Sequence, residues 1–166
     1  VVSYAGLSPI DGFISVLEIA PSTVDVAQVC SAIVPNSSGG FGWITAFGDG
    51  AAAGDDIVLF AHQLPPFQTT LFLNSRTTGS TPMVGGGEGT LCLGGTVNRY
   101  VGPGEINPAS PLGEAWLRLS LPNTPDGSVA SPVLAGETWY YQAWYRDVVG
   151  GAQTSNLTSA VAVTYR

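Results

Sequence analysis

The chain has 166 residues, of which 45% are hydrophobic and only 10% are charged, and its net charge is −7. This acidic balance argues against a nucleic-acid partner, because proteins bind nucleic acids by neutralising phosphates, and against an anionic membrane surface. The length suffices for one domain of ordinary size, and no apolar run reaches the roughly 18–20 residues of a membrane-spanning helix.

The first strong strand pattern covers residues 12–20 and stands in front of what we expect to be a complete domain. Apolar and β-branched residues favour a half-buried strand here. Residues 21–23, Pro-Ser-Thr, then interrupt the pattern. We therefore divide the chain into an extension, residues 1–29, and a domain, residues 30–166. An apolar strand outside a domain needs a sheet edge, which is either the edge of its own domain or that of the next copy of the chain. The candidate interface residues are Phe13, Ile14, Val16, Leu17 and Ile19.

The rest of the chain alternates apolar runs with clusters of its 22 glycines and 12 prolines, which is typical of an all-β domain. The segment 139–146 is aromatic on both faces and predicts a central, buried strand. The segment 112–119 is compatible with a short helix, but the flanking Pro111 and Pro122 favour a strand. We expect an antiparallel β-sandwich of about eight strands, immunoglobulin-like or jelly-roll, with an N-terminal extension strand. The expected strands are 12–20, 41–48, 56–63, 69–76, 90–100, 112–121, 137–147 and 159–166, and the expected loops are 49–56, 78–89 and 101–110.

The two cysteines, Cys30 and Cys92, suggest one disulfide bond if the protein is extracellular. This bond would close a loop of about 60 residues and contribute roughly 3–4 kcal/mol in the chain-entropy model. The alternative is two buried free thiols. A zinc site is not expected, because there is no CxxC motif and only one histidine.

Several motifs after Cys30 resemble those of an uncharacterised family of secreted bacterial β-domains found in large surface proteins. They are CSAIVPNSSG (30–39), QLPP (63–66), FLNSR (72–76), GTLCLGG (89–95), AGETW (135–139), QAWYRD (142–147) and TSNLT (154–158). The resemblance implies a secreted single β-domain and implies no reaction. Residues 1–29 fall outside it, and their strand resembles the donor-strand extensions of pilins. A chain that starts at Val1 also fits a processed secreted protein, so we expect an extracellular, cell-surface location.

The sequence indicates no catalytic site and no cofactor. A Ser-His-Asp triad would require His62, the only histidine, but no GxSxG motif accompanies it. We therefore expect a structural or surface histidine and no enzyme activity. The twelve acidic residues contain no pair whose spacing singles out a glycosidase.

Weaker patterns concern metals and sugars. Asp49, Asp55 and Asp56 share a Gly-rich loop and suit Ca²⁺ chemically, but their spacing is not that of an EF-hand, so we favour a solvated loop without metal. The glycine-rich segment 85–89 lacks the lysine of a phosphate-binding loop, and we expect a flexible loop there. Trp43, Trp116, Trp139 and Trp144 form either a sugar-stacking platform or parts of the core.

Further candidates are the two sequons that begin at Asn36 and Asn156, which are candidate glycosylation sites. A local charge pair is expected between Arg146 and Asp147.

The surface chemistry gives the leading functional hypothesis. The chain has no lysine and five arginines, although sheet proteins commonly protect exposed edges with charges. Such a surface fits coverage by neighbouring subunits or by glycans; the alternative is a secreted domain with a Ser/Thr/Asn surface. We expect a structural subunit of an extracellular filament or surface assembly, a head-to-tail homopolymer formed by β-strand addition. The competing hypothesis is a secreted carbohydrate-binding or adhesive module.

Overall fold

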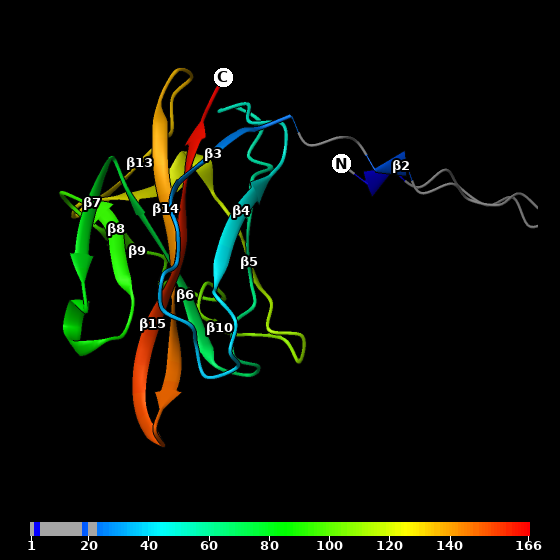
Figure 1. Cartoon of the computed structure of the whole chain (residues 1–166). Coiled ribbons are helices and arrows are strands. Elements are labelled where there is room, and N and C mark those ends of the chain that lie inside the picture. Colours follow the sequence, from blue (N-terminus) through cyan, green and yellow to red (C-terminus); the bar gives the residue numbers. More distant parts are fainter. Residues whose placement is uncertain (1, 4–17, 20–22) are drawn as a thin grey trace, which may run out of the picture.

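The computed structural model describes residues 2–3, 18–19 and 23–166, and Figure 1 shows their arrangement. Across these residues the regular structure consists of antiparallel strands and two short 3₁₀ turns, η1 (Val84–Gly86) and η2 (Leu121–Asn123). The predicted all-β class is therefore confirmed. No helix in this part of the chain has the length and apolar character needed to cross a membrane.

A six-stranded antiparallel sheet forms the middle of the molecule. Its strand order is β10-β6-β14-β15-β3, and β9 pairs with a further part of β6. The predicted central aromatic strand is β14, whose hairpin with β15 turns at Gly150 and Gly151. Both glycines have positive φ, 58° and 84°, as a two-residue type I′ turn requires. The bounds are β3 Asp25–Cys30, β6 Thr69–Ser75, β9 Asn98–Arg99, β10 Asn107–Pro108, β14 Thr138–Val149 and β15 Ala152–Thr164.

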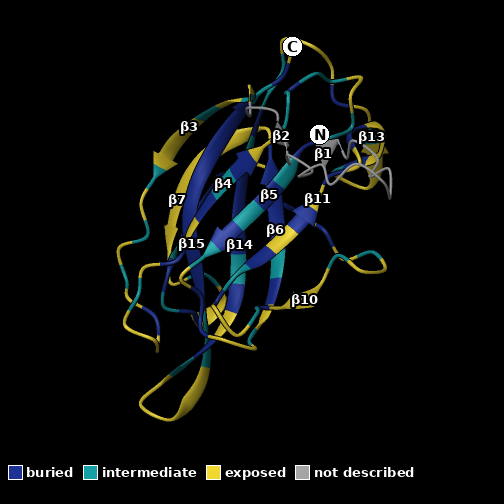
Figure 2. Cartoon of the chain, turned by 90° about the vertical axis from the view of Figure 1, so that its right-hand side faces the viewer, coloured by how far each residue is buried: buried dark blue, intermediate teal, exposed yellow. Residues whose placement is uncertain are grey.

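A three-stranded antiparallel sheet covers one face of this large sheet (Figures 1 and 2). It has the order β11-β5-β4, with β4 Trp43–Phe47, β5 Val58–His62 and β11 Ala115–Arg118. Alternate side chains of each small-sheet strand point inward, as the period of two in a strand dictates. The main core lies between the two sheets, where Leu59, Trp139, Tyr141 and Tyr145 are fully buried.

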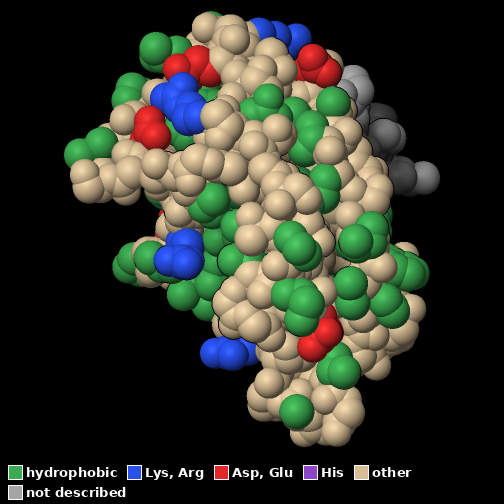
Figure 3. Space-filling model, turned by 60° about the vertical axis from the view of Figure 1, so that its left-hand side comes forward, with side chains coloured by type: hydrophobic (Ala, Val, Ile, Leu, Met, Phe, Trp, Pro, Cys, Tyr) green, Lys and Arg blue, Asp and Glu red, His purple; other side chains and the backbone are tan. Residues whose placement is uncertain are grey.

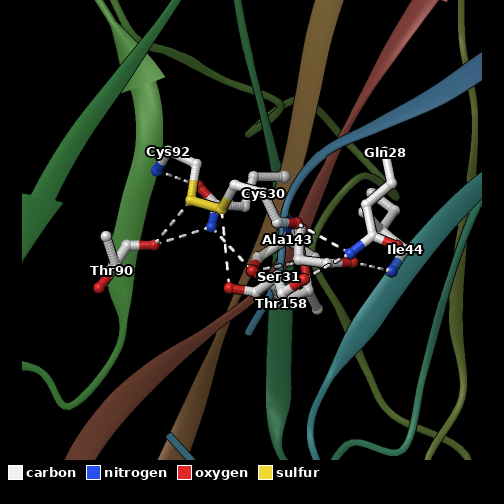
Figure 4. The surroundings of a disulfide bond; sticks show 10 residues. Gln28, Cys30, Ser31, Ile44, Thr90, Cys92, Ala143 and Thr158 are labelled. Carbon is white, nitrogen blue, oxygen red and sulfur yellow. Dashed lines mark hydrogen bonds between the residues drawn. A yellow bond between two sulfur atoms is a disulfide. The ribbon is translucent and has the colours of Figure 1, made fainter. Parts of the chain in front are cut away.

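The opposite face of the large sheet carries a hairpin of β7 (Thr77–Pro82) and β8 (Thr90–Gly94). A smaller core of Leu73, Leu93 and Leu157 lies beneath it. The predicted disulfide bond is present: Cys30 at the end of β3 is joined to Cys92 in β8, with their Cα atoms 6.3 Å apart (Figure 4). The bond thus fastens the hairpin to the large sheet. Two further short pairs are β12 (Thr124–Asp126) with β13 (Val129–Ser131), and β1 (Val2–Ser3) with β2 (Glu18–Ile19).

Of the N-terminal extension, residues 1–29, the structure describes β1, β2 and residues 23–29. β2 pairs with β1, so that Ile19 lies opposite Val2 and Glu18 opposite Ser3. Of the expected interface residues, Ile19 is therefore paired within its own chain, whereas positions 13, 14, 16 and 17 lie outside the described residues. The large sheet begins at Asp25, because β3 pairs with β15, which is earlier than the expected boundary at Cys30.

Other segments differ from the sequence-based expectation. The expected loop at 78–89 contains most of β7, and the expected loop at 101–110 contains the short β10. The expected strand at 90–100 is divided into β8 and β9 by a bend that includes Gly95, whose φ is 57°. The predicted loop at 49–56 is confirmed, since no strand occurs there.

Candidate functional site

Exposed rings cover the outer face of the three-stranded sheet. We define the aromatic face as Trp43 and Phe47 of β4, Phe60 and His62 of β5, and Trp116 of β11. The register places Trp43 opposite His62, and Phe60 opposite Trp116. Trp43 is 40% exposed and Trp116 is 63% exposed. Exposed apolar patches can serve as interaction surfaces, so the aromatic face is a candidate site.

The rings of the aromatic face contact one another in a row. The Trp43 and His62 rings are stacked with centroids 3.8 Å apart and an interplanar angle of 11°. Phe60 meets His62 edge-on at 4.1 Å, and Phe47 meets Phe60 at 6.2 Å. These contacts hold the rings in fixed orientations on the strands, so the face is formed before any partner arrives.

His62 lies inside this row. Its Nε2 is buried and has no hydrogen-bond partner within residues 23–166. Burial lowers the pKa of the imidazole, and the nearby Glu114 carboxylate opposes this shift only in part. Among residues 23–166, no serine or carboxylate is hydrogen-bonded to this ring, so His62 is not part of a Ser-His-Asp arrangement with those residues.

The four tryptophans do not form a single platform. Trp43 and Trp116 belong to the aromatic face, but Trp139 is fully buried in the main core. Trp144 of β14 lies on the opposite side of the molecule, next to the smaller core. The alternation of side chains along β14 separates Trp139 from Trp144, because positions of opposite parity point to opposite faces.

A first groove lies between the large sheet and the β7–β8 hairpin. It encloses about 370 Å³ and is lined by apolar side chains, among them Leu71, Leu91 and Leu157, together with Arg99 and Arg146. Figure 3 shows hydrophobic side chains gathered in a hollow with basic groups beside it. The Arg146 guanidinium lies 5.2 Å from the centre of the Trp144 ring, which is a cation–π distance.

A second groove lies along the outer edge of β11 and encloses about 700 Å³. Its other wall is the segment 103–110, which includes β10. Glu105, Glu114 and Arg118 supply its charges, and Pro103, Pro108 and Leu117 supply apolar surface. This groove therefore combines a strand edge with apolar walls.

The aspartates of the 49–56 loop form hydrogen bonds within the protein. The Asp49 carboxylate accepts from the Ala51 N–H at 2.7 Å, and the Asp55 carboxylate accepts from the Leu121 N–H at 2.6 Å. The Asp56 carboxylate accepts from the Asp49 N–H at 3.2 Å. Residues 23–166 contain no cluster of three or more potential metal ligands. The three carboxylates thus shape the loop.

The expected pair of Arg146 and Asp147 does not form. Neighbouring residues of a strand point to opposite faces, so Arg146 is exposed at the first groove while Asp147 is buried. The Asp147 carboxylate instead accepts a hydrogen bond from the Ser37 N–H at 3.0 Å. Within residues 23–166 the ion pairs are those of Arg76 with Asp126 and with Glu137.

The two sequon asparagines are also buried. Asn36 is 6% exposed and its amide donates to the Gln63 carbonyl oxygen; Asn156 is 1% exposed and its amide donates to the Val34 carbonyl oxygen. A glycan needs a side-chain nitrogen that reaches solvent, so this fold has no room for one at either site.

The sequence matches no family model, and comparison with curated proteins and with solved structures finds no similar protein. The resemblance of residues 30–166 to secreted bacterial β-domains therefore stays a prediction.

Proposed function

We propose that this protein is a structural subunit of an extracellular filament or surface assembly, built as a head-to-tail homopolymer. The observation that carries the proposal is the aromatic face, which leaves Trp43, Phe47 and Trp116 at the surface of a chain with 10% charged residues. Isolated exposed apolar residues are ordinary, but a continuous face of them calls for a partner. Covering it with neighbouring subunits would remove the apolar area from water.

The facing six- and three-stranded sheets support a β-sandwich architecture, in the broad group that includes immunoglobulin-like and jelly-roll folds. In this group an added strand from another subunit extends one sheet without disturbing the core. The disulfide bond is consistent with an oxidising, extracellular location.

The N-terminal extension supplies the strand in this proposal. Its apolar run at residues 13–19 precedes the strands of the large sheet. Its described ladder in this chain joins only two residues of β1 to two of β2. A pair of such short strands is marginal in water, so exchange for a longer ladder on a neighbour would be favourable.

The test compares assembly by full-length variants. Leu17→Asp should abolish filaments in electron micrographs and large species in light scattering, because it would bury an unpaired charge. Ser15→Asn keeps a neutral polar side chain at a position that is polar in the natural chain, so it is the control and should weaken assembly less. A wild-type protein that stays monomeric at high concentration would contradict the proposal, as would normal assembly by Leu17→Asp.

The second candidate function is a carbohydrate-binding or adhesive module. Trp43 and Trp116 favour it, because both are exposed on the same sheet face and aromatic rings stack on sugar rings. Titration of the protein with soluble oligosaccharides should then quench tryptophan fluorescence, and Trp116→Ala should remove that response. A lack of response across neutral, acidic and amino sugars would leave assembly as the better account.

A further inference from the structure

The two edges of the three-stranded sheet differ. The β4 edge is closed by the protein itself: the Ser159 N–H donates to the Gly42 carbonyl at 2.9 Å, and the Ile44 N–H donates to the Ser159 hydroxyl at 3.1 Å. At its far end, the Thr23 N–H donates to the Gly48 carbonyl at 2.9 Å. A strand that paired along the whole of β4 would have to break these bonds.

The β11 edge is open. Just after β11, the Leu119 N–H donates to the carbonyl of Ile57, the residue before β5, at 2.9 Å. Antiparallel pairing repeats this orientation at every second residue. The main-chain groups of Ala115 and Leu117 therefore face β5, whereas those of Trp116 and Arg118 point away from it. These two N–H and two C=O groups have no hydrogen-bond partner within residues 23–166.

The open edge lies inside the second groove. The 700 Å³ space separates β11 from the segment 103–110. Just before β11 begins, the two walls are joined, because the Ser110 N–H donates to the Glu114 carbonyl at 2.7 Å. An incoming strand would find main-chain partners on β11 and apolar contacts from Pro103, Pro108 and Leu117. This combination of edge and pocket is what strand addition requires.

We infer that the β11 edge is the acceptor site for the N-terminal strand, residues 12–20, of a second copy of this chain. The inference rests on the proposed function and names the site through which assembly occurs. Residues on one face of that strand would point inward, beside Ala115 and Leu117, and those on the other would point outward, beside Trp116 and Arg118. The inward set is Phe13, Ser15, Leu17 and Ile19, and the outward set is Ile14, Val16, Glu18 and Ala20.

Charge supports this orientation. Glu18 belongs to the outward set, on the same face as the exposed Arg118 of β11. The Arg118 guanidinium donates to the Asp55 carbonyl at 3.1 Å and has no carboxylate within salt-bridge distance among residues 23–166. A cross-strand pair of opposite charge is a stabilising contact in a sheet, so Glu18 of one copy would lie near Arg118 of the next.

The first test addresses the main chain. Trp116→Pro removes an N–H that points away from β5, so pairing with β5 should persist, but the incoming strand loses a donor and meets the proline ring. Trp116→Ala retains the N–H. We expect Trp116→Pro to raise the critical concentration for assembly at least tenfold relative to Trp116→Ala. Equal critical concentrations for the two folded variants, checked by circular dichroism, would overturn the inference.

The second test addresses the charges and stays informative if the proline variant does not fold. Arg118→Glu should weaken assembly, and the double variant Arg118→Glu/Glu18→Arg should restore it. Arg146→Glu makes the same charge change in the first groove and is the matched control, which should assemble as the wild type does. If Arg146→Glu is the damaging change and Arg118→Glu is not, the acceptor is the first groove and the inference is wrong.

A mixing experiment separates the inference from the proposed function. A full-length Leu17→Asp copy keeps the acceptor edge, and a full-length Trp116→Pro or Arg118→Glu copy keeps the strand. At a concentration below the raised critical concentrations of these variants, neither should polymerise alone, but an equimolar mixture should give a one-to-one dimer by light scattering. If Leu17→Asp blocks assembly while both β11 variants polymerise, strand donation survives and the β11 acceptor is refuted. If the wild type itself does not assemble, the proposed function fails first.

Discussion

Removing the disulfide bond should cost this protein a large part of its stability. Cys30 and Cys92 are separated by 62 positions in the chain, and the chain-entropy relation gives about 4 kcal/mol at 25 °C for a loop of this length. Domains are commonly stable by only about 5–15 kcal/mol. For a domain of this size, about 4 kcal/mol corresponds to a fall in melting temperature of about 8–16 °C.

The measurement compares the wild type with the double variant Cys30→Ala/Cys92→Ala. Urea unfolding followed by tryptophan fluorescence reports the loss, because Trp139 is fully buried in the main core. Mass spectrometry under non-reducing conditions verifies that the wild-type sample carries the bond. Wild type treated with a reductant should unfold at the same urea concentration as the double variant.

The loss should also be local. The β7–β8 hairpin contacts the large sheet through the small core that contains Leu73, Leu93 and Leu157, and the disulfide is its covalent attachment. Hydrogen exchange should therefore accelerate first in β7 and β8 when the bond is removed. A double variant within about 1 kcal/mol of the wild type, with unchanged exchange in the hairpin, would refute the loop-closure reasoning.

Three further predictions concern single positions. Gly113→Ala should destabilise the protein by at least about 2 kcal/mol more than Gly127→Ala in urea unfolding. Both glycines have positive φ (73° and 71°), but only at Gly113 would the new Cβ overlap the Leu64 carbonyl oxygen. Burial lowers the pKa of His62, so the unfolded state binds more protons than the folded state below about pH 6.5. The free energy of unfolding should therefore fall as the pH falls through this window. His62→Gln should flatten this dependence in unfolding curves recorded from about pH 8 to 5. Gln142→Leu should cost about 3 kcal/mol or more in thermal unfolding, because the buried amide donates to the Thr90 and Thr158 carbonyls and accepts from the Cys92 N–H.

The strands that the sequence predicted best are those with a strong apolar pattern. Residues 139–146 place aromatic rings on both faces, which predicts the central strand, and in β14 one face packs in the main core and the other against the smaller core. β7 was missed because its six residues, TTGSTP, are all exposed and contain no apolar alternation. The threonines at 77, 78 and 81 were the available signal, since β-branched residues favour strands.

β3 shows a different limit. Its sequence, DVAQVC, alternates weakly, and its side chains are mostly exposed because it is the edge of the large sheet. Main-chain hydrogen bonds to β15 hold much of this strand, while among its side chains Val26 packs against the main core and Cys30 forms the disulfide. One packed valine gives a weak hydrophobic pattern. The boundary of the domain was therefore placed at Cys30, where the apolar pattern and the resemblance begin, rather than at Asp25.

The candidate site was only partly accessible from the sequence. Alternation within β4 and β5 places Trp43 with Phe47, and Phe60 with His62, on single faces. That these faces join, with Trp116 beside them, depends on the pairing register of three strands that are far apart in the chain. The sequence contains four tryptophans but does not tell which face of the sheets each side chain occupies. The strand pairing shows that Trp43 and Trp116 are exposed, whereas Trp139 is buried.

The open edge of β11 is the feature that a solitary protein would be expected to protect. Natural sheets shield such edges with lysine, proline, a bulge or a covering segment, and β11 has the sequence Ala-Trp-Leu-Arg with one charge and a regular register. The chain does close its other small-sheet edge, through Ser159 and through the segment before β3. One edge closed by specific hydrogen bonds and one left bare within a groove is an asymmetry that random exposure does not explain. A strand added to the bare edge would satisfy the main-chain groups of Trp116 and Arg118. A chain that carries both a donor strand and this acceptor edge would form a contact that repeats without closing. In the proposed assembly each subunit is completed by the next, and the lack of lysine and the bare edge would both follow from that requirement.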